Sequence, residues 1–108
     1  MSHELIVLVT TSSKDQAVTI ANALVSEQLA ACANIIERIE SVYRWEGKIV
    51  QDSESLLIIK TTDGRYDNLE RRVKQLHSYS TPEVIAIKIE RGSSEYLRWL
   101  EESVRQSD

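Results

Sequence analysis

The sequence predicts a mixed α/β (α+β) domain with a ferredoxin-like β-α-β-β-α-β order and an additional C-terminal helix. Short apolar, β-branched runs alternate with amphipathic helical patterns, and a glycine turn joins two long extended segments. Each of these elements also has its own start and stop signals. With 108 residues, the chain fits a single domain over residues 1–108.

The first predicted strand is the apolar run of residues 5–9. Ser13 and Gln16 then fit a capping box, in which the Ser13 hydroxyl accepts an amide hydrogen bond and the Gln16 side chain reaches back. Apolar residues at helical spacing predict a helix that places Cys32 at its end. The apolar face of this helix consists of Ala17, Ile20, Ala21, Leu24 and Ala31.

Two long strands are predicted for residues 34–45 and 49–62, joined at the Glu46-Gly47-Lys48 turn. Glycine favours such a turn because it tolerates positive φ. The polar residues 51–53 interrupt the apolar pattern of the second strand and predict a bulge or kink there. The hairpin is therefore long for a chain of this size.

A second helix follows Asp63-Gly64, and residues 77–82 form a loop because Pro82 disfavours helix at the residue before it. Residues 84–89 predict the fourth strand, and residues 92–94 cap the final helix. The apolar positions of these two helices are Tyr66, Leu69, Val73 and Leu76, and Tyr96, Leu97, Leu100 and Val104.

Three predicted strand segments are apolar at every position: residues 5–9, 56–59 and 84–87. About half of these side chains must point away from the helices, because neighbours in a strand face opposite sides. Leaving roughly six of them in water forfeits on the order of 10 kcal/mol, at about 25 cal/mol per Å². We therefore expect copies of the chain to cover this face, the alternative being that the C-terminal helix alone seals it.

Composition argues against several classes of partner. A net charge of −4 without any run of Lys or Arg disfavours a nucleic-acid binder. The apolar stretches are too short to cross a membrane, and the N-terminal residues do not resemble a signal peptide. The single cysteine excludes an internal disulfide framework and fits a cytoplasmic location.

Cys32 and His77 are the first candidates for chemistry. Cys32 has no basic neighbour in the sequence, so packing in the core is favoured over a nucleophile. His77 is the candidate metal ligand, since imidazole binds Zn, Cu and Ni. No second ligand stands at a typical spacing, although a cyclic oligomer would bring several copies of His77 together. The favoured alternative is that His77 caps its helix or hydrogen-bonds its loop.

Trp45, Lys60, Tyr79 and Glu83 lie near predicted strand ends, where clefts form. Tyr and Trp are more often core or interface residues than ligand contacts. The three glycines are isolated turn residues, so there is no glycine-rich phosphate loop. No nucleophile, base and orienting group can be assembled, and an enzyme is not predicted.

Five segments, which together span nearly the whole chain in the same order, resemble the CutA divalent-cation tolerance family. The segments are Leu29-Ala-Ala-Cys-Ala-Asn-Ile-Ile36, Tyr43-Arg-Trp-Glu-Gly-Lys-Ile49, Leu57-Ile-Ile-Lys-Thr61, His77-Ser-Tyr-Ser-Thr-Pro-Glu83 and Tyr96-Leu-Arg-Trp-Leu100. The resemblance implies a ferredoxin-like subunit in a tight homotrimer, similar in build to the PII signalling proteins. It also implies a cytoplasmic protein that is linked to tolerance of copper and other divalent cations. The matching motif positions include Cys32, Trp45, Lys60, Tyr79 and Glu83.

The chain departs from the family pattern at four positions. Ser78 and Ser80 replace the residues usual in the family's loop. Copper-binding members can carry a cysteine in the first strand and a second histidine just before the loop, where this chain has Val9 and Leu76. Only His77 remains of that ligand set.

Two functional hypotheses follow. The leading one is a non-enzymatic trimer that acts in the divalent-cation response, with weak binding of Cu or Zn around His77. The alternative is a PII-like sensor that binds a small anionic metabolite or nucleotide in clefts between subunits. Lys60, Arg44 or Lys88 would then contact the anion.

Overall fold

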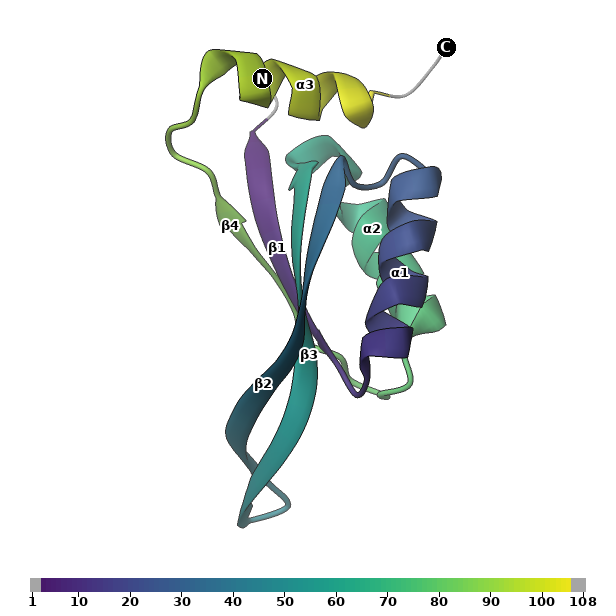
Figure 1. The fold of residues 1–108 in the computed structure, drawn as a ribbon, viewed down its shortest axis with the longest axis vertical. Coiled ribbons are helices and arrows are strands. Elements are labelled where there is room, and N and C mark those ends of the chain that lie inside the picture. Colours follow the sequence, from purple (N-terminus) through teal and green to yellow (C-terminus); the bar gives the residue numbers. More distant parts are fainter. Residues whose placement is uncertain (1–2, 106–108) are drawn as a thin grey trace.

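The computed structural model describes residues 3–105 and shows a four-stranded antiparallel sheet with two helices on one face and a third across one end (Figure 1). The strands are ordered β2-β3-β1-β4, which is the predicted ferredoxin-like topology. The elements are β1 (Glu4–Thr11), α1 (Lys14–Ser26), β2 (Cys32–Trp45), β3 (Lys48–Thr62), α2 (Asp63–Leu76), β4 (Val84–Lys88) and α3 (Ser94–Ser103).

The core lies between the sheet and the pair α1 and α2. Alternate residues of the two central strands are fully buried there, because successive strand residues point to opposite faces. The helices contribute the inner residues that their spacing predicts. The strands supply Val7, Val9, Leu57 and Ile59, and the helices supply Ala17, Ile20, Leu24, Leu69 and Val73.

Helix α1 ends at Ser26, more than a turn earlier than the sequence pattern predicts. Gln28 has a left-handed backbone with φ of 59°, and the Leu29 amide donates to the Leu24 carbonyl at 2.9 Å. These are features of a Schellman motif, in which glycine is the usual left-handed residue. Because glutamine occupies that position, no residue type in this segment marks the end of the helix. The prediction that Cys32 ends the helix is therefore wrong, and Cys32 begins β2.

The bulge of the hairpin lies in β2 and not at residues 51–53 of β3. The strand register shifts between Ile36 and Ile39, so that two residues of β2 oppose Ser55 alone. The Ser55 hydroxyl donates to the Glu37 carbonyl at 2.7 Å. This bond satisfies a carbonyl at the bulge, and β3 continues without a break into the turn at Gly47.

The caps of the helices follow the predictions in part. The amide of Gln16 donates to the Ser13 hydroxyl, as expected for the first half of the capping box. The Gln16 side chain does not reach back and instead accepts a hydrogen bond from Ser78 at 3.1 Å. Ser93 caps α3 by accepting from the amide of Tyr96.

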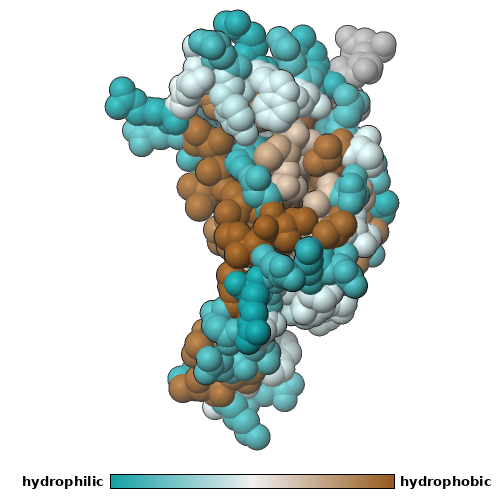
Figure 2. Space-filling view, viewed as in Figure 1, coloured by the Kyte–Doolittle hydropathy of each residue, from teal (hydrophilic) through white to brown (hydrophobic). Residues whose placement is uncertain are grey.

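The second face of the sheet, here called the open face, carries apolar side chains that α1 and α2 do not cover. Helix α3 packs across one end of the sheet, around Leu100 and Val104, and no helix lies over the rest of this face within residues 3–105. Ile85 and Ile87 are 50% and 53% exposed. Figure 2 shows apolar residues gathered below α3, on the side away from α1 and α2. The apolar residues of the open face are Ile6, Leu8, Ile36, Leu56, Ile58, Ile85 and Ile87.

Within residues 3–105, no helix has the length and apolar character needed to cross a bilayer.

Candidate functional site

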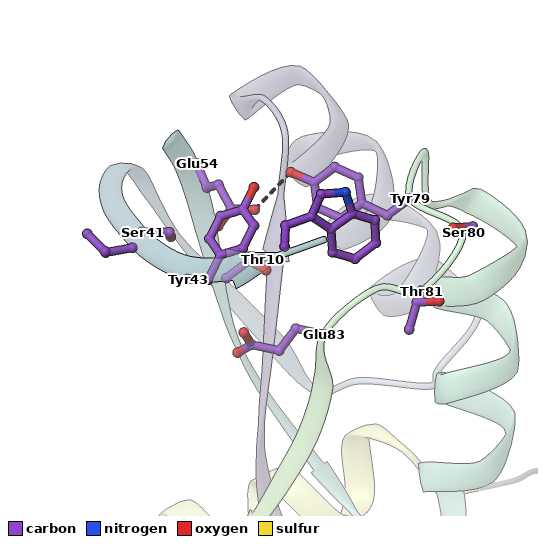
Figure 3. Close-up of a pocket in the computed structure, with 10 residues that line it drawn as sticks. Thr10, Ser41, Tyr43, Glu54, Tyr79, Ser80, Thr81 and Glu83 are labelled. Carbon is purple, nitrogen blue, oxygen red and sulfur yellow. Dashed lines mark hydrogen bonds between the residues drawn. The ribbon is translucent and has the colours of Figure 1, made fainter. Parts of the chain in front are cut away.

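A pocket of about 610 Å³ lies between the hairpin and the loop that follows α2. Three of the predicted site residues, Trp45, Tyr79 and Glu83, line it, although they are far apart in the sequence. Figure 3 shows Tyr43 and Glu54 of the hairpin facing Tyr79 of the loop. The lining comprises the aromatic residues Tyr43, Trp45 and Tyr79, the acidic residues Glu54 and Glu83, the hydroxyl residues Thr10, Ser41, Ser80 and Thr81, and Val42.

Two tyrosine–carboxylate hydrogen bonds organise the pocket. The Tyr79 hydroxyl donates to Glu54 Oε2 at 2.8 Å, and the Tyr43 hydroxyl donates to Asp52 Oδ2 at 2.5 Å. Burial, together with the hydrogen bond to Glu54, raises the pKa of Tyr79 well above its ordinary value. The hydrogen bond to Asp52 raises the pKa of Tyr43 as well. Both phenols therefore remain donors at physiological pH.

The charge of the pocket is acidic. Glu54 and Glu83 are its ionisable carboxylates, and no Lys, Arg or His is among its ten lining residues. A bound anion would meet two carboxylates without a compensating cation, whereas a bound cation would be attracted by both. Aromatic rings add to this preference, because their faces attract positive charge. In one protomer, the pocket is therefore suited to a cation.

His77 does not line this pocket, but it contacts two residues that do, Thr10 and Tyr79, and it forms the C-cap of α2. It is buried, its Nε2 lies 2.7 Å from the Thr10 carbonyl oxygen, and its Nδ1 accepts from the Tyr79 amide at 3.0 Å. A carbonyl only accepts and an amide only donates, so the pair of bonds fixes the Nε2–H tautomer. The prediction was that His77 caps its helix or hydrogen-bonds its loop. The side chain bonds the loop at the Tyr79 amide, and it is the backbone amide of His77 that caps α2, by donating to the Val73 carbonyl.

The role of His77 as a metal ligand stays a prediction. Both ring nitrogens are engaged, so a metal ion would have to replace one of these two hydrogen bonds. Residues 3–105 of one protomer contain no group of three or more His, Cys, Asp or Glu side chains placed to hold a metal ion. Further ligands would have to come from another copy of the chain or from solvent.

Cys32 and Lys60 lie in a separate cluster toward the α3 end of the open face. Lys60 pairs with Cys32 across β2 and β3, and its ammonium lies 3.8 Å from the thiol and also bonds the Asn34 side chain. Cys32 is only half-buried, so the expected packing in the core is wrong. The basic neighbour was not visible in the sequence because it comes from the adjacent strand.

The three cations of the anion-binding hypothesis do not meet within one protomer. Arg44 pairs with Ile49 near the hairpin turn, whereas Lys60 lies at the other end of β3. Lys88 ends β4 beside Leu5. A site that uses all three would need more than one copy of the chain.

Sequence reasoning missed Tyr43, Asp52 and Glu54. These residues share one side of the hairpin because of the strand register, which places Tyr43 opposite Val50 and Glu54 opposite Ile39. These pairs all lie between the turn and the bulge of β2, so the register that unites the three residues follows from the glycine turn alone. The bulge predicted at residues 51–53 would have shifted the pairing of Glu54, which is why Glu54 was not placed beside Tyr43.

Comparison with known proteins identifies relatives over most of the chain. Residues 5–103 match the family model described as CutA1 divalent ion tolerance protein. The "Divalent-cation tolerance protein CutA" of Thermus thermophilus is 50% identical over 100 residues, which are 93% of this chain and 97% of the relative. The chloroplastic "Protein CutA 1" of Oryza sativa is 48% identical over 103 residues, which are 95% of this chain and 58% of the relative. This chain therefore spans little more than half of that plant protein.

Solved structures agree with these matches. A divalent cation tolerance protein (Cut A1) from Thermus thermophilus superposes with a TM-score of 0.93 at 49% identity, over 94% of this chain and 99% of that one. The crystal structure of CutA1 from Oryza sativa gives a TM-score of 0.94 at 48% identity, over 97% and 96% of the two chains. The family model and the Thermus thermophilus relative are named for tolerance of divalent cations and not as enzymes.

Proposed function

This chain belongs to the CutA1 divalent ion tolerance family, and on that basis we propose that it acts as a non-enzymatic homotrimer in the cellular response to divalent cations, copper among them. The observation that carries the proposal is the family match over residues 5–103. A binding role fits the pocket, which offers charge and aromatic surface but no assembled nucleophile and base.

The open face supports the homotrimer. Ile36, Ile85 and Ile87 are each about half exposed in a single copy, on a sheet whose other face packs against α1 and α2. Contiguous exposed apolar surface of this kind is rare in monomers and common at subunit interfaces. A ring of three copies would bury these faces against one another and close without leaving a free edge.

For the cation itself, we place a weak site around His77, next to the acidic pocket. Glu54 and Glu83 would attract the ion, and the imidazole suits Cu²⁺ and Zn²⁺. Binding would be weak because the ion must displace the hydrogen bond of His77 to either Thr10 or Tyr79. Such a site could respond to a rise in free metal without holding metal permanently.

Calorimetric titration with Cu²⁺ and with Zn²⁺ tests this site. The chain has two histidines, so His77→Ala has a matched control in His3→Ala at an exposed position. We expect His77→Ala to weaken binding about tenfold or more, as for the loss of one imidazole ligand, and His3→Ala to leave it unchanged. Equal affinities in the two variants would contradict a site at His77.

The alternative, a PII-like sensor of a small anionic metabolite or nucleotide, is favoured by one observation. Among residues 3–105, Arg44, Lys60 and Lys88 take part in no ion pair, which leaves their charges available to an anion between copies. Titration with common nucleotides in the presence of a metal chelator tests it. Saturable binding that Lys60→Gln abolishes would support the sensor over the metal-binding hypothesis.

We propose the cytoplasm as the compartment, because the chain has one thiol and no disulfide partner for it. We also propose that neither nucleic acid nor a membrane is a partner of this protein. Fractionation of cells that express the full chain would test the compartment, and recovery in a membrane or secreted fraction would contradict it.

A further inference from the structure

The aromatic residues of the pocket are not explained by a metal site at His77. A divalent metal ion is coordinated by oxygen, nitrogen or sulfur atoms at short range and not by the faces of aromatic rings. Yet Tyr43, Trp45 and Tyr79 all line the pocket, and in a single copy Trp45 is 58% exposed. Large aromatic surface beside carboxylates is the chemistry that recognises alkylammonium groups.

We infer that this pocket binds a small organic cation with an ammonium head group, held between the rings of Tyr43, Trp45 and Tyr79 and the carboxylates of Glu54 and Glu83. The inference goes beyond the proposed function, since it needs neither a metal ion nor a free nitrogen on His77.

The size and charge of the pocket fit such a ligand. Its volume of about 610 Å³ lies within the range usual for small-molecule sites, which is roughly 300–1,000 Å³. Glu54 and Glu83 come from different segments, β3 and the loop before β4, and Figure 3 shows Glu83 set apart from the pair of Glu54 and Tyr79. Two separated carboxylates match an extended organic cation better than a single metal ion.

The Tyr79 ring is held in place before a ligand arrives. Its hydroxyl bonds Glu54, its amide bonds His77 Nδ1, and its ring centroid lies 4.7 Å from that of His77. The His77 ring is fixed in turn by the Thr10 carbonyl. A ligand that stacks on Tyr79 therefore orders few additional groups, which favours affinity. In this reading His77 is a positioning residue for the pocket.

Choline and 3,3-dimethyl-1-butanol provide a decisive pair of probes, because they share a shape and differ in charge. Each would be titrated by calorimetry into the full chain with EDTA present, so that metal binding cannot contribute. We expect choline to bind at least about tenfold more tightly than the uncharged alcohol. Equal affinities, or no choline binding, would overturn the inference without bearing on the metal site at His77.

Variants locate the binding. Glu83→Gln should weaken choline binding several-fold, while Glu90→Gln, which removes the same charge from an exposed position outside the pocket, should not. Trp45→Leu should also weaken it, and Trp45 fluorescence in a Trp99→Phe background should change on binding. Light scattering on each variant checks that the assembly is unaltered. Unchanged affinity in both Glu83→Gln and Trp45→Leu would place the site elsewhere and overturn the inference.

Discussion

Leu56 and Leu57 are neighbours on β3 with the same side chain, yet Leu57 is fully buried under the helices and Leu56 is only partly buried on the open face. The same contrast separates Ile59 from Ile58. The two faces therefore have similar apolar composition and different cover. Helices α1 and α2 account for one face, and α3 reaches only the end of the other.

The difference shows that the sequence is adapted to two buried faces, although one copy of the chain buries only one. Helix-covered antiparallel sheets usually alternate apolar and polar residues when the second face meets water. Here Ile6 and Leu8 of β1 stand where polar residues would be expected. Substitutions on the open face therefore distinguish an oligomer from a monomer, because they lower stability strongly only if other copies bury that face.

The largest effect is expected from a charge on the open face. Ile58→Asp would place an unpaired carboxylate in a dry interface, at a cost of about 3–5 kcal/mol per copy. We expect the assembly to dissociate or unfold, measured as a fall in mass by light scattering or as loss of the folding transition. Val18→Asp, on the outer side of α1, is the control and should leave the mass unchanged. If Ile58→Asp kept the mass and the melting curve of the unsubstituted protein, the open face would be exposed to solvent and not buried between copies.

Truncating the two leucines tests the comparison more finely. Leu57→Ala should lower the free energy of unfolding by about 2–5 kcal/mol, as for other fully buried leucines. If other copies cover the open face, Leu56→Ala should cost a similar amount, although in one copy Leu56 is only partly buried. Denaturant titration of both variants at the same protein concentration gives the two values. A cost below about 1 kcal/mol for Leu56→Ala alone would contradict the covered face.

The parts of the fold that could be predicted are those that depend on the local sequence pattern. The strands and the inner faces of the helices are encoded by local periodicity, and residues such as Leu69 and Val73 lie where their spacing places them. The end of α1 depends on a left-handed Gln28, a conformation for which glutamine gives no warning. The bulge depends on Ser55, which contacts Glu37 across the hairpin. Contacts between residues that are distant in the sequence leave no local sequence pattern.

The candidate site shows the same division. Trp45, Tyr79 and Glu83 could be selected one by one, because amphipathic residues at strand ends often line clefts. Their meeting in one pocket, and the addition of Glu54, required the strand register. Likewise, only the register brings Lys60 to Cys32.

The tyrosines extend the comparison to alkaline pH. Burial and the hydrogen bond to Glu70 raise the pKa of Tyr66, on the helix side, to about 12, and burial with the Glu54 bond raises the pKa of Tyr79 on the open-face side. A tyrosine whose pKa is raised in the folded protein stabilises the fold at every pH below 10, the ordinary tyrosine pKa. This stabilisation is lost as the pH rises through the higher pKa of the folded state. Absorbance of phenolate near 295 nm should therefore appear at higher pH in the native protein than in urea.

Tyr66→Phe and Tyr79→Phe test which tyrosine, on which side of the sheet, causes this shift of the titration to higher pH. Each substitution should remove a late-titrating tyrosine from the native curve and leave the curve in urea otherwise similar. If the native and urea curves of the unsubstituted chain coincide, neither hydroxyl is held as the structure indicates.

The smallest effect is expected where α3 meets the open face. Burial, together with a hydrogen bond to Glu4 of β1, raises the pKa of Glu101 above its ordinary value of 4.5. Protonated Glu101 therefore stabilises the fold; this contribution is complete below about pH 4.5 and declines as pH rises through the folded pKa. At neutral pH the two carboxylates would repel each other where α3 covers one end of the open face.

Glu101→Gln keeps a donor toward Glu4 and removes the repulsion. We expect it to raise the melting temperature slightly at pH 7 and to have no such effect at pH 4, whereas Glu102→Gln, exposed on the same helix, should do neither. Hydrogen exchange of α3 amides should slow in Glu101→Gln at pH 7, since the helix would open less often. Equal exchange rates of these amides in Glu101→Gln and in the unsubstituted chain at pH 7 would show that this contact does not control the opening of α3.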